Sequence, residues 1–124
     1  MPRVQPRWPP LALAALFGLS GGLHLLRPGI FRPLVPRALP ARDAIVALSG
    51  LAELVCAVGL ASGQRWAAPA SVALLVAVYP GNIQFALDRA GDPTADRRVV
   101  ALAWLRLPLQ WPLIQAARIA GRSR

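Results

Sequence analysis

The sequence has one cysteine, Cys56, one histidine, His24, and one glutamate, Glu53, among its 124 residues. A lone cysteine excludes an intramolecular disulfide, a C-x-x-C thiol-exchange site and a cysteine-rich metal centre within the chain. One histidine and one glutamate fall short of the ligand set that a protein metal site requires. We therefore expect no metal site and no covalently bound cofactor, and we interpret Cys56 as a buried structural thiol.

Acidic residues are also scarce, with five against 14 basic residues and a net charge of +9. Such a balance would suit nucleic acid if the basic residues lay along one amphipathic face. Every arginine except Arg106 instead flanks or separates an apolar run, as charges at membrane edges do. The charge pattern therefore predicts contact with the lipid bilayer and no nucleic-acid partner.

Long apolar runs dominate the rest of the chain. Hydrophobic residues make up 56% of the sequence and the mean hydropathy is +0.48, which is too apolar for an ordinary soluble domain of this length. A helix needs about 20 apolar residues to cross a hydrocarbon core about 30 Å thick. Four runs are long enough, at residues 8–26, 44–64, 66–87 and 99–117. We predict an all-α integral membrane four-helix bundle, forming one domain over residues 1–124.

The connections between these runs contain residues that end helices. Four prolines between Arg27 and Pro40 rule out a continuous helix, so this stretch is predicted to be a proline-rich interfacial segment between the first two spans. Residues 62–65 predict a tight hairpin, which makes the second and third spans antiparallel neighbours. Residues 88–98 predict a polar aqueous loop.

Two local features bear on how the helices pack. Gly18 and Gly22 form a G-x-x-x-G pattern, which can let two helices approach closely, although the pattern is a weak signal in a chain this rich in glycine and alanine. Pro80 is expected to interrupt the third helix, because proline lacks a backbone donor. A break there would free backbone carbonyls toward the bundle interior. The alternative is a kink at Pro80 that serves only helix packing.

Polar side chains inside the apolar runs form the candidate site. Ionisable groups are costly in hydrocarbon unless they pair or face water, so each marks a functional hypothesis. Glu53 lies at the middle of its span and Arg106 about 3 Å from the middle of its own, which predicts that they face each other. We expect a ligand-binding cleft that opens toward the proline-rich segment, lined by His24, Glu53, Asn82, Arg106 and Gln110. The alternative is a Glu53–Arg106 pair that only neutralises itself.

An ordered set of motifs resembles one known family. The motifs are Gly22-Leu23-His24, Phe31-Arg32-Pro33-Leu34-Val35-Pro36, Leu39-Pro40, Leu48-Ser49-Gly50-Leu51-Ala52-Glu53-Leu54, Val78-Tyr79-Pro80-Gly81-Asn82-Ile83 and Arg106-Leu107-Pro108-Leu109-Gln110. Over nearly the whole chain they resemble the DoxX and DoxX-like family of small four-span bacterial membrane proteins, with Gly81 where that family often has alanine. The resemblance implies a multi-pass protein of the bacterial inner membrane. Some relatives look like membrane subunits of redox assemblies, including a thiosulfate to quinone oxidoreductase, and no catalytic residues carry over.

Three functions stay open at this point. The first is a membrane subunit of a redox assembly, whose cleft receives a quinone or a lipid headgroup. This function requires a membrane or soluble redox partner, because the chain has no group of its own that carries electrons. The second is a non-catalytic scaffold for another membrane protein, and the third is a small permease, which the uneven depths of the polar groups disfavour. Four spans place both termini on one side, which we expect to be the cytoplasm.

Overall fold

The computed structural model describes residues 8–35 and 38–122. In these residues every regular element is a helix, so the all-α prediction is confirmed for them. The elements in chain order are α1 (Trp8–Leu26), α2 (Pro28–Phe31), the 3-10 turn η1 (Arg32–Leu34), α3 (Arg42–Ser62), α4 (Ala67–Ala90) and α5 (Arg97–Arg122). The four long helices coincide with the four apolar runs to within a few residues.

The predicted hairpin between the second and third spans is present and is formed by a left-handed glycine. Gly63 ends α3 with φ 80°, a conformation that side chains rarely tolerate. The backbone N–H of Gln64 then donates to the carbonyl of Gly59 at 2.8 Å, which caps the end of the helix. The chain reverses within a few residues and begins α4 at Ala67.

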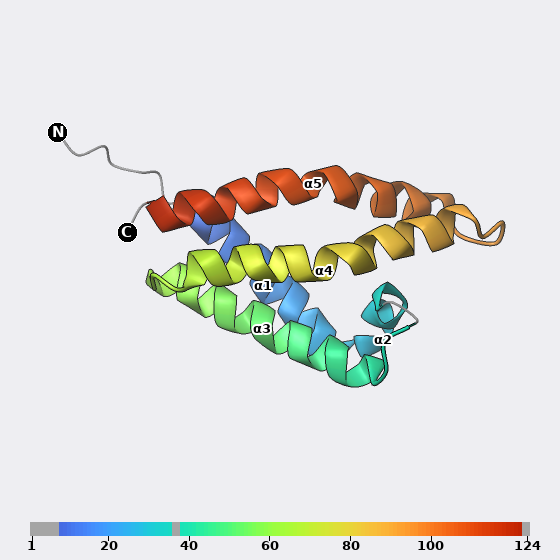
Figure 1. The fold of residues 1–124 in the computed structure, drawn as a ribbon, viewed down its shortest axis with the longest axis horizontal. Helices are drawn as coiled ribbons and strands as arrows, with labels where there is room; N and C mark the ends of the chain where they lie inside the picture. The colour runs from blue at the N-terminus through green and yellow to red at the C-terminus, as the bar shows by residue number, and fades with distance from the viewer. Residues whose placement is uncertain (1–7, 36–37, 123–124) are drawn as a thin grey trace.

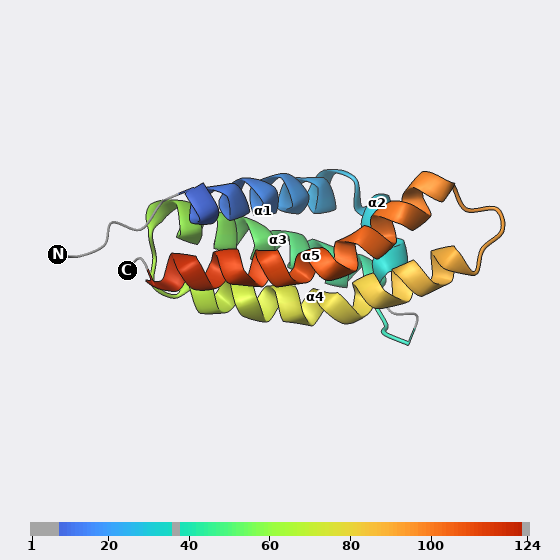
Figure 2. The same cartoon turned by 90° about the horizontal axis from the view of Figure 1, so that it is seen from above.

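Proline acts differently in the loop and in the long helices. In the proline-rich segment, Pro28 and Pro33 stand in the first turns of α2 and η1, where a missing N–H costs no helical hydrogen bond. The segment therefore forms two short turns and no continuous helix, as predicted. The expected interruption at Pro80 is wrong, because α4 runs from Ala67 to Ala90 through it. Figures 1 and 2 show instead that α4 bends partway along its length.

The long helices pack as two antiparallel pairs. α1 lies along α3, and α4 lies along α5 (Figures 1 and 2). Contacts between α3 and α4 and between α1 and α5 join the pairs into a ring of four helices. Helix α1 begins and α5 ends at the same end of the molecule (Figure 1), while α2 and η1 lie at the other end, where η1 contacts α4.

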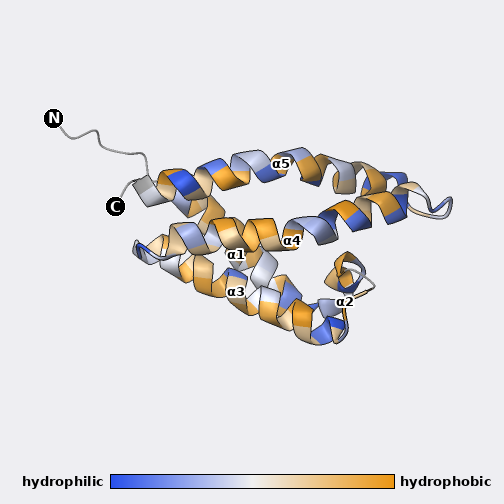
Figure 3. Ribbon diagram, in the orientation of Figure 1, coloured by the Kyte–Doolittle hydropathy of each residue, from blue (hydrophilic) through white to orange (hydrophobic). Residues whose placement is uncertain are grey.

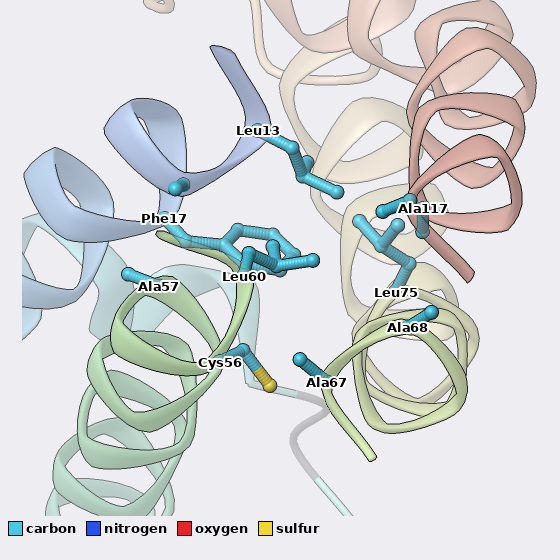
Figure 4. Packing of buried hydrophobic residues seen from close by; sticks show 11 residues of the cluster. Leu13, Phe17, Cys56, Ala57, Leu60, Ala67, Ala68, Leu75 and Ala117 are labelled. Carbon is cyan, nitrogen blue, oxygen red and sulfur yellow. The ribbon is translucent and has the colours of Figure 1, made fainter. Parts of the chain in front are cut away.

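A dry core fills the half of the ring nearest the α3–α4 hairpin (Figure 4). Leu13 and Phe17 of α1 pack there against Cys56 and Leu60 of α3. Helices α4 and α5 contribute mostly alanines, among them Ala67, Ala68 and Ala117. Small residues let the helix backbones approach closely. Cys56 is a free, buried thiol of this core, as the sequence predicts.

Hydrophobic residues occur along all four long helices (Figure 3), and many of the large ones are exposed. Leu19, Leu48, Val58 and Leu102 are among the large hydrophobic residues that face outward. In the described residues, three helices are long and apolar enough to cross a membrane: Pro9–Leu26, Arg42–Ser62 and Ala67–Ala90.

The fourth expected span, residues 99–117, lies within α5, which is not among these three helices. The physical reason is its polar content, since Arg106, Gln110 and Gln115 interrupt the apolar stretch. The structure thus establishes an all-helical protein with three helices suited to a membrane.

The close approach between α1 and α3 occurs at glycines outside the G-x-x-x-G pair. A Cβ added to Gly21 would lie 2.7 Å from the carbonyl oxygen of Gly50, and one added to Gly50 would lie 2.6 Å from the Cβ of His24. A Cβ on Gly18 or Gly22 would meet nothing within 4 Å. The G-x-x-x-G pair therefore makes no close contact among the described residues, and Gly21 with Gly50 makes the contact instead.

This contact predicts opposite outcomes for two pairs of substitutions. Gly21→Ala or Gly50→Ala should destabilise the protein by about 1–3 kcal/mol, because the backbones of α1 and α3 would have to move apart. The matched controls Gly18→Ala and Gly22→Ala should be neutral or slightly stabilising, since alanine favours helix and has room there. Unfolding of each variant in detergent, followed by circular dichroism, measures the difference. Equal effects at all four glycines would contradict the assigned contact.

Candidate functional site

A cavity of about 490 Å³ occupies the half of the helical ring opposite the dry core. All four long helices line it, and a further wall is formed by residues of the proline-rich segment, namely Phe31, Leu34, Val35 and Leu39. The segment that was expected at the mouth of a cleft is thus part of the cavity itself. Four of the five predicted site residues are in the lining: His24, Glu53, Asn82 and Arg106.

His24 is held from three directions. Its Nδ1–H donates to the Ser20 carbonyl, one turn earlier in α1, at 2.6 Å. Its ring stacks on Phe31 of α2, with ring centroids 3.6 Å apart and an interplanar angle of 16°. Its Nδ1 also lies 3.6 Å from Glu53 Oε2, which makes an ion pair whenever the imidazole is protonated. Both side chains are largely buried, so the imidazole is fixed beside the carboxylate.

Glu53 therefore has a different neighbour from the one that its depth predicts. Among the described residues its ion-pair contact is with His24, and Arg106 makes no ion pair with it within 4 Å. Arg106 and Glu53 line the same cavity, so they share a compartment without direct contact. Glu53 and Arg106 lie at a similar position along the bundle axis, as predicted, because both line this cavity. The predicted ion pair between them is wrong, because the ion-pair contact of Glu53 is with His24.

Gln110 serves the packing of two helices and does not line the cavity. Its Nε2 donates to the carbonyl of Leu75 in α4 at 2.7 Å, and its Oε1 accepts from Arg106 Nη1 at 3.2 Å. A second hydrogen bond joins these helices, from the Tyr79 hydroxyl to the Leu107 carbonyl at 3.3 Å. The hydrogen bond to Gln110 thus orients the Arg106 guanidinium.

Two polar atoms on the cavity residues are buried without a described partner. Glu53 Oε2, an acceptor, and Asn82 Nδ2, a donor, make no hydrogen bond to the described residues, and each residue is only 8% exposed. An unsatisfied buried polar group costs about 1–3 kcal/mol. Ser71 Oγ is a third such atom, but Ser71 does not line the cavity. An acceptor and a donor in one cavity fit a ligand that offers both functions.

Ser20 is the site residue that sequence reasoning missed. It lines the cavity, and its carbonyl holds His24 in place. The available signal was its spacing of four residues from His24, which puts both on one face of a helix. No group of three or more His, Cys, Asp or Glu side chains within residues 8–35 and 38–122 could hold a metal ion.

A family model described as "Domain of unknown function (DUF8561)" matches residues 13–120. The chain belongs to this family. We found no matching curated protein and no matching solved structure. Membership in DUF8561 carries no activity, so the resemblance to DoxX stays an interpretation of the motifs and any function has to be argued from the cavity.

The geometry predicts which charges are energetically coupled. In a double-mutant cycle, Glu53→Gln and His24→Gln should deviate from additivity by about 0.5–3 kcal/mol, because the two groups are in contact. The matched cycle of Glu53→Gln with Arg106→Gln should be closer to additive. Detergent unfolding of the single and double variants gives both coupling energies. A larger coupling to Arg106 than to His24 would contradict the observed arrangement.

Proposed function

We propose that this DUF8561 chain is a four-span protein of the bacterial inner membrane. In this proposal helix α5 is itself the fourth span, although it is less apolar than the other three long helices. Gln110 is buried, and Arg106 faces the cavity and bonds Gln110, so these groups lower the hydropathy of α5 without being presented to lipid. Helix α5 also packs against α4 and α1 and completes the ring. Ionisable groups in spans characteristically face such interiors.

The proposed orientation places both termini in the cytoplasm. Arginine numbers on the two sides are nearly balanced, so the argument rests on Asp88, Asp92 and Asp96, which dilute the positive charge of the opposite side. A green fluorescent protein fused after Arg124 should therefore fluoresce, and alkaline phosphatase at the same position should be inactive. The same reporters inserted after Thr94 should show the reverse pattern. Active phosphatase after Arg124 would reverse the orientation.

The function that the cavity supports best is binding of a quinone ring. The observation that carries this proposal is a buried acceptor and a buried donor in one compartment: Glu53 Oε2 accepts no hydrogen bond from the described residues, although His24 Nδ1 lies 3.6 Å away, and Asn82 Nδ2 donates none to them. In the reduced form of the ring, one quinol hydroxyl would donate to Glu53 and the other would accept from Asn82, whereas the carbonyls of the oxidised form would accept from Asn82 only. The volume of about 490 Å³ lies within the range of small-molecule pockets. Several apolar side chains from α3 and α4, together with Phe31, Leu34, Val35 and Leu39, complete the lining, as an aromatic ring requires.

Quinone binding makes the chain a non-autonomous subunit. The sequence provides no flavin or nucleotide motif and no cysteine pair, so a membrane or soluble partner would supply the redox centre. His24 and Glu53 would then hold the proton that accompanies reduction or oxidation of the ring. The DoxX resemblance favours the same function. The alternative is a scaffold in which the cavity has no ligand.

Binding of a short-chain ubiquinone or menaquinone to the protein in nanodiscs tests this function. Asn82→Leu removes the donor at similar volume and should weaken binding about tenfold, since a lost hydrogen bond to a buried group is worth about 1–3 kcal/mol. Ser71→Ala is the matched control, because it removes an equally unpartnered atom outside the cavity. Equilibrium dialysis with labelled quinone gives the affinities. No saturable binding to folded protein, or equal affinity in both variants, would leave the scaffold as the better function.

A further inference from the structure

A second cavity, of about 460 Å³, lies beside the first and has a different character. Three guanidinium groups and two carboxylates line it: Arg32, Arg42, Arg89, Asp88 and Asp92. Val35 is buried and lines both cavities, so the two compartments lie on either side of η1 and the residue that follows it. We call this second cavity the outer cavity and the first the inner cavity. None of the charged groups of the outer cavity takes part in the proposed binding of a quinone.

The outer cavity lies at the height expected for lipid headgroups. Helix α3 begins at Arg42 and continues for 21 residues to the hairpin, a rise of about 31 Å. This length equals the thickness of a hydrocarbon core, about 30 Å. Asp88 and Arg89 lie in the last turn of α4, which is antiparallel to α3. The charged lining is thus one hydrocarbon thickness away from the hairpin, at the edge of the apolar zone.

The guanidinium groups differ in how they are engaged. Arg32 Nε donates to Asp43 Oδ1 at 2.6 Å, and Arg89 lies over the ring of Phe85 with Nη1 3.9 Å from Asp92 Oδ2. Arg42 makes no hydrogen bond or ion pair with any residue in the ranges 8–35 and 38–122. Arg42 is therefore the guanidinium whose N–H donors are available to a ligand. The planar guanidinium matches the geometry of a phosphate group, which can accept two of its hydrogen bonds.

The carboxylates of the outer cavity determine which kind of phosphate-containing ligand fits. The Thr94 hydroxyl and backbone N–H both donate to Asp92 Oδ1, at 2.6 and 2.9 Å. These hydrogen bonds, together with Arg89, hold the pKa of Asp92 below its ordinary value, so it stays ionised at neutral pH. Asp88 adds a second carboxylate to the same lining. A ligand of net negative charge would meet both carboxylates, whereas a phosphate ester that also carries an ammonium group would use both signs of charge.

We propose that the outer cavity binds a phosphoethanolamine group, with the phosphate at Arg42 and the ammonium at Asp92. At the edge of the apolar zone the natural source is the headgroup of phosphatidylethanolamine, whose acyl chains would lie against the outward leucines and valines. A soluble phosphoethanolamine ester carries the same chemistry. A choline headgroup lacks N–H donors for the carboxylates, and a glycerol headgroup lacks the positive charge.

Native mass spectrometry of the delipidated protein in detergent tests the assignment. The ligands are dihexanoyl phosphatidylethanolamine, the corresponding phosphatidylcholine and phosphatidylglycerol, and glycerophosphoethanolamine, which has no acyl chains. Phosphatidylethanolamine should bind at least about fivefold more tightly than the other two lipids, because only its headgroup pairs with both signs of charge. Weaker binding of glycerophosphoethanolamine would assign the lipid as the source. Equal binding of the two ethanolamine ligands would keep the headgroup chemistry and assign a soluble ester.

Two variants separate a built site from general attraction to a basic surface. Arg42→Gln should weaken phosphatidylethanolamine binding about tenfold, as loss of a charge-assisted contact would. Arg65→Gln is the matched control, since Arg65 is an exposed arginine in the hairpin at the other end of the molecule. Asp92→Asn should narrow the preference for phosphatidylethanolamine over phosphatidylglycerol. Equal binding of all three lipids, or equal losses in Arg42→Gln and Arg65→Gln, would overturn the proposal and leave quinone binding in the inner cavity untouched.

Discussion

The contact between the backbones of α1 and α3 is the constraint on which the site depends. Gly50 has no side chain, and the Cβ of His24 occupies the space that its Cβ would take. Gly21 makes the reciprocal approach one turn earlier in α1. With the backbones this close, His24 of α1 reaches Glu53 of α3, and Phe31 stacks on the fixed imidazole. The glycine contact thus determines where the inner cavity lies and which polar groups face it.

The two halves of the helical ring have opposite physical character. Around the α3–α4 hairpin, alanines, leucines and Phe17 pack into a dry cluster (Figure 4). Around α2 and η1 lie both cavities and most of the buried polar side chains. Because buried polar atoms without partners lower stability, the dry half has to stabilise the arrangement of the other half.

The sequence predicts well how far along a helix a residue lies, but it predicts poorly which side of the helix faces a given neighbour. The apolar runs, the prolines and Gly63 specify where helices begin and end, so the helix bounds and the hairpin are predictable. The depth of Glu53, Asn82 and Arg106 likewise predicts that they share a compartment. Which face of α1 meets α3 depends on tertiary packing, so the weak G-x-x-x-G pattern at Gly18 and Gly22 does not mark the contact. For the same reason depth alone could not distinguish His24 from Arg106 as the neighbour of Glu53.

The location of the unpartnered atoms argues for a ligand more strongly than their number does. An apolar side chain in place of Glu53 or Asn82 would avoid the cost of burying polar atoms, and replacing buried polar groups by packed apolar ones is often neutral or stabilising. Ser71 shows that a buried polar atom without a hydrogen-bond partner also occurs outside this cavity. Glu53 Oε2 and Asn82 Nδ2, by contrast, are an acceptor and a donor on residues that line one cavity of about 490 Å³. A molecule that hydrogen-bonds to both atoms would make the hydrogen bonds that they lack in the folded protein. The free energy of those hydrogen bonds is the physical basis for binding in this cavity.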